Sequence, residues 1–429
     1  MAHLQIRNIG PLSNVDFPIN RLNVIIGKQS TGKSTIAKIM SFCLWLEKDI
    51  VAHQNANYID NIFIKKQLLD YHKLGNYLND GAFIFYDGES ISFEFRGVDN
   101  FKITLKDNFY NANTGKVAYI PAERNLVALA NISSLSMDKN YVRDFLFNWL
   151  SVHDKYKKEG AVPIVDLGVN YYFDTDLNKD RIILKGGKEL GIDEVSSGMQ
   201  SVIPLFIYLR YVTKWVFEND EETSFDKYSV LQKAYIKSLS PDMGDEFMER
   251  VLAIPDFNQK LKDFIGELKN LGESEQVSDQ LKKMNLSEIS QLIDRIGRPH
   301  YANVVIEEPE LNLFPQTQVR LVYDMLREFD FERDKLLITT HSPYTLYAVN
   351  NCMLGFLVKD ELDEDDIAHL ACLNSVIDPD KVSVWQITDT GTLENIKNSA
   401  VGIIGNHYFN EVMNDTLDEY HLMLNYLEL

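Results

Sequence analysis

Three segments of the chain carry side chains suited to phosphate chemistry, and the first is a glycine-rich loop. It reads G-x-x-x-x-G-K-[ST] and follows an apolar strand expected at Leu22 to Ile26. The glycines let backbone N–H groups curl around phosphate oxygens, and the start of the following helix adds favourable partial charge. We expect Lys33 to reach the β- and γ-phosphates and the Ser34 hydroxyl to bind Mg²⁺. ATP is therefore predicted to contact Gly27, Lys28, Gln29, Ser30, Thr31, Gly32, Lys33, Ser34 and Thr35.

The second segment is a pair of acids at the end of an apolar strand. Val304 to Ile306 is followed directly by Glu307 and Glu308. Charge at the tip of a buried strand is costly unless it serves a metal or a water. We expect Glu307 to hold Mg²⁺ through its water shell and Glu308 to orient and deprotonate the attacking water. Capping of the helix that follows is the alternative.

The third segment is another apolar strand, Leu336 to Ile338, which leads to His341. An imidazole there could sense the γ-phosphate and hold the attacking water in line. Taken alone, a histidine such as His341 is more often a structural residue. It lies about 34 residues after Glu307, which is one strand–helix–strand unit, so both side chains can sit at neighbouring strand ends.

The hydrophobic pattern around these segments predicts an α/β fold. Strand, helix, strand, helix is expected from residue 302 onward, and charged segments with helical periodicity predict a helical insert at 219–298. We divide the chain into an N-terminal lobe at 1–218, this insert, and a C-terminal lobe at 299–429. The other expected strands are Leu4 to Ile9, Ala82 to Tyr86, Ser90 to Phe95, Phe101 to Leu105 and Val117 to Ile120, and the other expected helices are Ser197 to Phe217 and Gln316 to Phe329.

Net charge, the length of apolar stretches and the number of cysteines argue against several classes of function. The chain has 429 residues and a formal charge of -20, which repels nucleic acid at long range and argues against nonspecific coating of DNA. Local basic groups at 155–158 and 179–188 leave a nucleic-acid contact possible. No apolar stretch approaches the roughly 20 residues of a membrane span, and the N-terminus lacks a signal-peptide pattern, so we expect a cytoplasmic protein without a membrane partner. The three cysteines, Cys43, Cys352 and Cys372, predict reduced core thiols.

A fourth segment opens the expected helix at Ser197 with Ser196, Ser197 and Gly198. Alone, this is a common helix-capping turn. Together with the three segments above, it resembles the ABC signature loop, in which Ser and Gly of one subunit contact the γ-phosphate bound by the other. The chain thus resembles the ABC/SMC/RecF branch of P-loop ATPases. The closest likeness is to the overcoming-lysogenization-defect (OLD) type, carried by the strings 307–315, 340–343 and 120–124.

This resemblance implies an ABC-ATPase head with a P-loop parallel or mixed sheet and an antiparallel β subdomain. It also implies ATP and Mg²⁺ as ligands and a homodimer closed around ATP. Lys33, Ser34, Glu307, Glu308 and His341 would act in their own subunit, and Ser196, Ser197 and Gly198 on the partner's nucleotide.

The chain departs from the family pattern at three places. The family's Asp at the metal position is Glu307, and no Gln follows the strand ending at Ile120, where Glu123, Arg124 or Asn125 could substitute. About 88 residues follow His341, too few for the TOPRIM nuclease domain of OLD proteins. The acidic run 360–366 could imitate the metal ligands of that domain, although a solvated loop is the favoured interpretation.

Three functions follow from these features. The leading hypothesis is a regulatory ATPase subunit of a multi-protein antiphage system, with a nuclease or toxin effector on a separate chain. The alternative is a DNA-repair or chromosome-associated ATPase that clamps DNA. A transporter subunit ranks last, because about 105 residues separate Ser196 from the strand before Glu307, whereas transporters place about 20 there.

Overall fold

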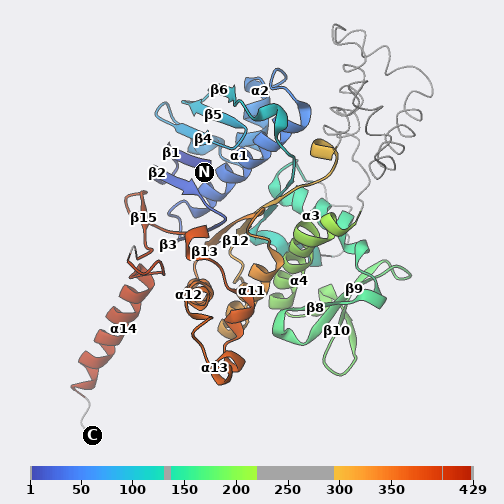
Figure 1. Ribbon diagram of the computed structural model, residues 1–429, viewed down its shortest axis with the longest axis vertical. Coiled ribbons are helices and arrows are strands. Elements are labelled where there is room, and N and C mark those ends of the chain that lie inside the picture. Colours follow the sequence, from blue (N-terminus) through green and yellow to red (C-terminus); the bar gives the residue numbers. More distant parts are fainter. Residues whose placement is uncertain (1, 130–136, 220–293, 399, 427–429) are drawn as a thin grey trace.

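A six-stranded sheet forms the centre of the molecule (Figure 1). The computed structural model describes residues 2–129, 137–219, 294–398 and 400–426, so nearly all of the predicted helical insert lies outside the described residues. The strands run in the order β15-β14-β3-β13-β12-β7. Neighbours are parallel except for β14 and β15, which are antiparallel. The bounds are β3 Leu22–Gly27, β7 Lys116–Ile120, β12 Ala302–Glu307, β13 Lys335–Thr340, β14 Val382–Ile387 and β15 Leu393–Asn395.

A five-stranded antiparallel sheet lies beside the central one, in the order β2-β1-β4-β5-β6. Its strands are β1 Ala2–Ile9, β2 Leu12–Ile19, β4 Phe83–Asp87, β5 Ile91–Arg96 and β6 Asn100–Leu105. The predicted β meander is confirmed as β4 to β6. The pairing partner of β1 was not anticipated, because β2 is an edge strand whose sequence carries Asp16 and Pro18 among its apolar residues. An edge position tolerates both residues.

A third, four-stranded antiparallel sheet has the order β11-β10-β9-β8. Its strands are β8 Val162–Ile164, β9 Val169–Asp174, β10 Lys179–Ile183 and β11 Glu189–Gly191. The helices are α1 Lys33–His53, α2 Asn61–Ile64, α3 Tyr141–Val152, α4 Ser197–Arg210, α5 Val216–Glu218, α11 Pro315–Glu328, α12 Pro343–Val358, α13 Glu364–His369 and α14 Tyr408–Leu424. A π-helical turn, Tyr211–Trp215, joins α4 to α5, which fits the single helix predicted from Ser197 to about Phe217.

The central strands are buried on both faces, and consecutive residues face opposite sides. Ile25 and Val305 pack with α1 and the five-stranded sheet in one buried cluster. Val24 and Val304, one position earlier, pack with α3, α4, α11 and α12 in the other. Each fully buried aliphatic side chain stabilises the fold by roughly 1.5–3 kcal/mol relative to exposure. The sheet is therefore a rigid support for the residues at its strand ends.

The predicted α/β class, with one mostly parallel sheet and an antiparallel β subdomain, is confirmed. The central sheet takes β3 and β7 from the predicted N-terminal lobe and β12 to β15 from the C-terminal lobe. The division into lobes and insert stays a prediction. The three cysteines are buried and free. Within the described ranges, no helix is long and apolar enough to cross a membrane.

Candidate active site

The glycine-rich loop connects β3 to α1, as the motif requires. Gly32, with φ of 105°, caps α1, and a Cβ there would lie 2.5 Å from the Leu12 Cδ2 atom, so a glycine is needed. Lys33 begins the helix and is 5% exposed. Its Nζ donates hydrogen bonds of 2.8 Å to the carbonyls of Gly27 and Lys28. Burial lowers the pKa of Lys33 to about 8, although Glu308 and other nearby acids oppose this shift. The ammonium is thus held against the concave side of the loop.

Glu307 ends β12 and is 5% exposed. Its carboxylate accepts hydrogen bonds from the Tyr119 hydroxyl and from the Ser34 side chain. Burial raises the pKa of Glu307, and these two hydrogen bonds partly offset that effect. A serine hydroxyl beside a buried carboxylate is a pair of oxygen ligands suited to a hard divalent cation. The two residues predicted to hold Mg²⁺ therefore lie together and fit that ion.

Glu308 faces His341 at the edge of the sheet. One carboxylate oxygen lies 3.5 Å from the His341 Nε2 atom, and both side chains are 30% exposed. The backbone of Glu308 has φ of 45°, a conformation that non-glycine residues rarely adopt and that is often found at functional sites. The hydrogen bond from His341 lowers the pKa of Glu308, so the carboxylate can accept a proton at neutral pH. Because α11 begins only at Pro315, neither Glu307 nor Glu308 caps that helix, and the capping alternative is excluded.

Glu310 is a further acid in this group, and the sequence analysis gave it no role. Its carboxylate accepts a hydrogen bond of 2.7 Å from the His341 backbone N–H, so it fixes the backbone that carries the imidazole. Burial raises the pKa of Glu310. Its second carboxylate oxygen is buried with no hydrogen-bond partner among the described residues. The signal available in the sequence was the third acid of the Glu307-Glu308-Pro309-Glu310 string.

Arg124 is fully buried and bonds only to backbone carbonyls. The guanidinium donates to the carbonyls of Glu307 at 2.9 Å, Glu308 at 2.7 Å and Ser201 at 3.0 Å, and also to those of Pro121 and Pro309 at 3.2 Å. These five bonds tie the Arg124 side chain to the backbone of its own chain, and the residue that takes the place of the missing glutamine stays a prediction. Of the two other candidates, Glu123 lies close enough to Glu307 to raise its pKa.

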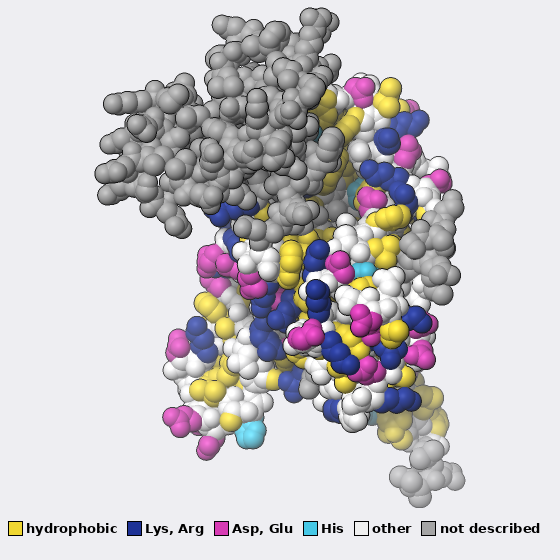
Figure 2. All heavy atoms as spheres, turned by 90° about the vertical axis from the view of Figure 1, so that its right-hand side faces the viewer, with side chains coloured by type: hydrophobic (Ala, Val, Ile, Leu, Met, Phe, Trp, Pro, Cys, Tyr) yellow, Lys and Arg dark blue, Asp and Glu magenta, His cyan; other side chains and the backbone are white. Residues whose placement is uncertain are grey.

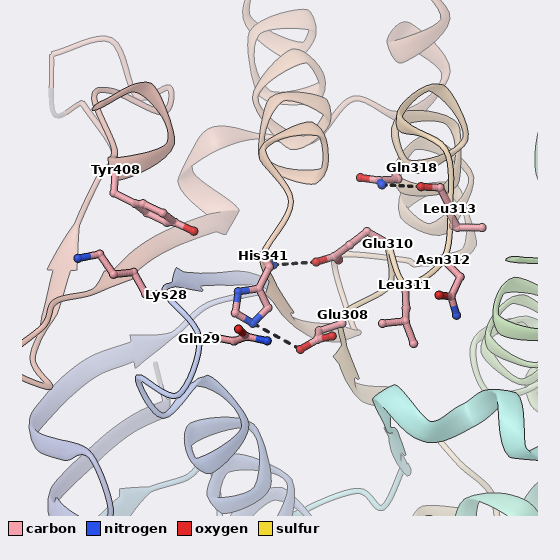
Figure 3. A pocket seen from close by; sticks show the side chains of 10 residues that line it. All are labelled: Lys28, Gln29, Glu308, Glu310, Leu311, Asn312, Leu313, Gln318, His341 and Tyr408. Carbon is pink, nitrogen blue, oxygen red and sulfur yellow. Dashed lines mark hydrogen bonds and ion pairs between the residues drawn. The ribbon is translucent and has the colours of Figure 1, made fainter. Parts of the chain in front are cut away.

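Glu308, Glu310 and His341 line an open cleft of about 620 Å³ at the end of the central sheet (Figure 3). Lys28 and Gln29 of the glycine-rich loop lie on the same cleft, whereas Lys33 and Glu307 are not among its lining residues. Tyr408, the first residue of α14, also faces the cleft, and nothing in the sequence pointed to it. The lining residues are Lys28, Gln29, Glu308, Glu310, Leu311, Asn312, Leu313, Gln318, His341 and Tyr408.

The predicted signature loop does not line this cleft. Ser196 caps α4 by accepting from the Met199 N–H at 3.4 Å, and Ser196 and Ser197 are exposed. A Cβ on Gly198 would lie 2.7 Å from the Asn312 carbonyl oxygen, so this glycine is needed for packing within its own chain. The structure thus brings together the loop, the acids and the histidine, and leaves the two serines free to meet another molecule.

The remaining charged segments are solvated. Asp363 caps α13 by accepting from the Asp366 N–H at 2.9 Å, and the acids of the run 360–366 are exposed. This exposure fits the favoured interpretation of the acidic run. In the basic groups, Lys158 pairs with Glu189 at 2.8 Å and Lys155 with Asp154 at 3.6 Å. On the face shown in Figure 2, lysine and arginine are interspersed with acids.

No protein-family model and no curated protein matches the chain. Solved structures do match. An SMC head domain from Thermotoga maritima is 8% identical, with a TM-score of 0.37 over 92% of this chain and 98% of that one. An SMC head with an extended coiled coil, bound to the C-terminal domain of ScpA derived from Pyrococcus furiosus, is 8% identical, with a TM-score of 0.39 over 98% and 100%. The recombination mediator RecF is 12% identical, with a TM-score of 0.27 over 92% and 97%.

Proposed function

We propose that the chain is an ATP-binding and ATP-hydrolysing head of the ABC/SMC type. The observation that carries this proposal is convergence at one edge of the sheet. The adjacent parallel strands β3, β13 and β12 end, in that order, at the loop containing Lys33, at His341 and at Glu307 with Glu308. Ligand sites in parallel α/β sheets occur at the carboxyl ends of the strands. A cation, two acids and an imidazole there match the needs of phosphoryl transfer to water.

Each residue has a distinct part in this proposal. The loop N–H groups and Lys33 bind the phosphates of ATP, and Lys33 exchanges its two carbonyl partners for phosphate oxygens. Ser34 and Glu307 would hold Mg²⁺, which supplies charge neutralisation at the β- and γ-phosphates. Glu308 accepts the proton of the attacking water. His341 positions the Glu308 carboxylate and would sense the γ-phosphate.

We infer that the site is completed by a second copy of the chain. Ser196 and Ser197 are exposed and lie outside the lining of their own cleft. If they contact phosphate, they contact the partner's phosphate across a two-fold interface, which requires the same surface on both subunits. ATP would then stabilise a homodimer with two nucleotides between the subunits.

At the biological level, we propose a regulatory ATPase subunit of an antiphage system with a separate effector. The OLD-like strings around Glu307, His341 and Arg124 support this proposal. The formal charge of -20 counts against the DNA-clamping alternative, because it repels nucleic acid at long range.

Release of phosphate from ATP tests the enzymatic part of the proposal. We expect slow, Mg²⁺-dependent hydrolysis by wild type and loss of ATP binding in Lys33→Ala, because the variant loses the charge-assisted contacts proposed between the ammonium and the phosphates. Lys158→Ala is the matched control, since it removes an equivalent charge from a short turn, Lys158–Gly160, where the ammonium pairs with Glu189 of the four-stranded sheet. Unchanged ATP affinity in Lys33→Ala would refute the assignment of the loop as the phosphate site.

A further inference from the structure

Tyr408 lines the same cleft as Glu308 and His341. It is the first residue of α14, and its ring extends into the cleft from the side that carries Lys28 (Figure 3). No step of the proposed hydrolysis uses this residue. A phenol carries a hydrogen-bond donor, and a donor that faces a nucleotide site can contact a phosphate oxygen.

The backbone around Tyr408 is held by contacts with the body of the molecule. The Tyr408 N–H donates to the Gln386 side chain of β14 at 2.9 Å. Four residues earlier, the N–H of the buried residue Ile404 donates to the Asn350 side chain of α12 at 2.8 Å. Two elements next to the site, β14 and α12, therefore fix where the phenol lies.

The Tyr408 hydroxyl is an unused donor on this cleft. Burial raises the pKa of Tyr408, and Glu310 adds to that shift, so the hydroxyl keeps its proton at neutral pH. Among the described residues, no hydrogen bond is found for this hydroxyl, whereas the backbone N–H of the same residue has Gln386. Four other lining side chains with donors already pair within the chain: Lys28 with Asp389, Asn312 with Ser201, Gln318 with Leu313, and His341 with Glu308.

The cleft corresponds to the γ-phosphate end of the proposed nucleotide site. Glu308 and His341, which are proposed to act on the attacking water and the γ-phosphate, line it. Lys33 and Glu307, which are proposed to bind the phosphates and Mg²⁺, do not. The lining acids Glu308 and Glu310 repel a phosphate, so a phosphate held between these walls needs donors on the same walls. The unused phenol is such a donor.

We propose that the Tyr408 hydroxyl donates a hydrogen bond to the γ-phosphate of bound ATP and thereby lets the site distinguish ATP from ADP. The inference rests on the proposed ATP site and adds a residue to it. ADP lacks the acceptor, so the hydroxyl contributes nothing to its binding. Hydrogen bonds to charged groups are stronger than neutral ones, and the loss of this donor should weaken binding of a triphosphate by about ten- to a hundredfold.

Nucleotide affinities of Tyr408→Phe test the proposal. The probes are ADP and adenylyl imidodiphosphate, a non-hydrolysable analogue of ATP, each titrated with Mg²⁺ into the full chain by calorimetry. Phenylalanine keeps the ring, whose centroid lies 4.2 Å from that of Phe409, and removes only the hydroxyl. We expect affinity for the analogue to fall by about ten- to a hundredfold, while affinity for ADP is unchanged.

Tyr347→Phe is the matched control. The Tyr347 hydroxyl donates to the Asn410 side chain at 3.0 Å, so it anchors the first turn of α14 without lining the cleft. We expect this variant to bind both nucleotides as wild type does. A loss of analogue affinity equal to that of Tyr408→Phe would show that the effect passes through the helix, and it would overturn the proposal.

Other results would also overturn it. If wild type binds the analogue and Tyr408→Phe binds it equally well, or loses ADP affinity to the same extent, the hydroxyl does not contact the γ-phosphate. A loss seen only at protein concentrations where sedimentation detects a dimer would place Tyr408 against the second copy. Wild type that binds neither nucleotide would refute the ATP site itself and this inference with it, so the two failures are distinguishable.

Discussion

The carboxylate of Glu308 and the Nε2 atom of His341 lie 3.5 Å apart at the ends of neighbouring parallel strands. The contact lowers the pKa of Glu308 and orients the carboxylate toward the cleft. Glu307, one residue earlier, points instead to Tyr119 and Ser34. Two successive acids therefore have different surroundings, and their variants should fail in different ways.

Glu308→Gln should separate binding from hydrolysis. Glutamine keeps the size of the side chain but cannot accept the proton of water, so turnover should fall by about 10²–10⁴-fold while ATP affinity is kept. The ATP-bound dimer should accumulate and be visible in size-exclusion chromatography. An enzyme that turns over ATP at the wild-type rate would show that Glu308 is not the base.

Glu307→Gln should weaken the metal site itself. The loss of a carboxylate beside Ser34 lowers Mg²⁺ affinity, so both turnover and Mg²⁺-dependent ATP affinity should fall. The measurement is ATP affinity and turnover across a Mg²⁺ titration, with Glu308→Gln in parallel. If Glu307→Gln trapped the nucleotide and Glu308→Gln lost Mg²⁺ dependence, the two assignments would be reversed.

Mixing two inactive variants tests the composite site. Lys33→Ala and Ser197→Arg each destroy both sites of a homodimer, but a heterodimer of the two keeps one intact site. Random reassortment of equal amounts should restore about a quarter of wild-type activity. Ser197 is exposed, so its replacement should leave the fold intact. A mixture that contains heterodimers and shows no activity would contradict the action of Ser197 on the partner's nucleotide.

Replacement of Arg124 should lower stability as well as activity. Arg124→Met leaves five buried carbonyl contacts without a donor, and we expect the free energy of unfolding to fall by about 3–5 kcal/mol. Arg124→Lys should rescue little, because one ammonium cannot replace the fork of a guanidinium. Denaturant unfolding measures the stability of both variants. A loss below about 1 kcal/mol for Arg124→Met would contradict the stabilising role of these five hydrogen bonds.

His72 should make folding sensitive to acid. It is 3% exposed and stacks on Tyr141, and burial, with Lys38 nearby, lowers its pKa to about 3. The unfolded chain has a His pKa of about 6.5, above that of the folded protein. The stability contributed by the neutral imidazole of His72 is therefore fully present above pH 6.5 and is lost as the pH falls toward 3. Between pH 7 and pH 5, wild type should lose about 2 kcal/mol more than His72→Phe. Equal losses in denaturant unfolding would contradict a buried neutral imidazole.

The strand ends could be predicted from the sequence because each is an unbroken apolar run that stops at a polar residue. Val304 to Ile306 before Glu307 is the clearest example, and His341 was found in the same way. β2 could not be predicted so readily, because Asp16 and Pro18 interrupt its alternation and its place at a sheet edge is set by tertiary pairing.

The site residues that the sequence missed depend on contacts between distant parts of the chain. The bond from Arg124 to the Glu307 carbonyl spans 183 residues. Tyr408 reaches the cleft only because β14 and the segment after it bring the chain back beside the glycine-rich loop. From the sequence, Arg124 was named only as a substitute for the missing glutamine and Tyr408 was not named, because no local pattern indicates the contacts that either residue makes. Glu310 lay in a string already noted, but only the structure shows its bond to the His341 backbone.

The guanidinium of Arg124 links the end of β12 to α4 within one subunit, because it donates hydrogen bonds to the carbonyls of Glu308 and Ser201. In the proposed dimer, Glu308 at the end of β12 acts on the nucleotide of its own subunit, and the serines at the N-terminus of α4 contact the nucleotide of the partner. Displacement of Glu308 on hydrolysis at the first nucleotide would therefore tilt the serines that contact the second. We expect the two sites to communicate, with ATP turnover that is sigmoidal in ATP concentration and a Hill coefficient above one.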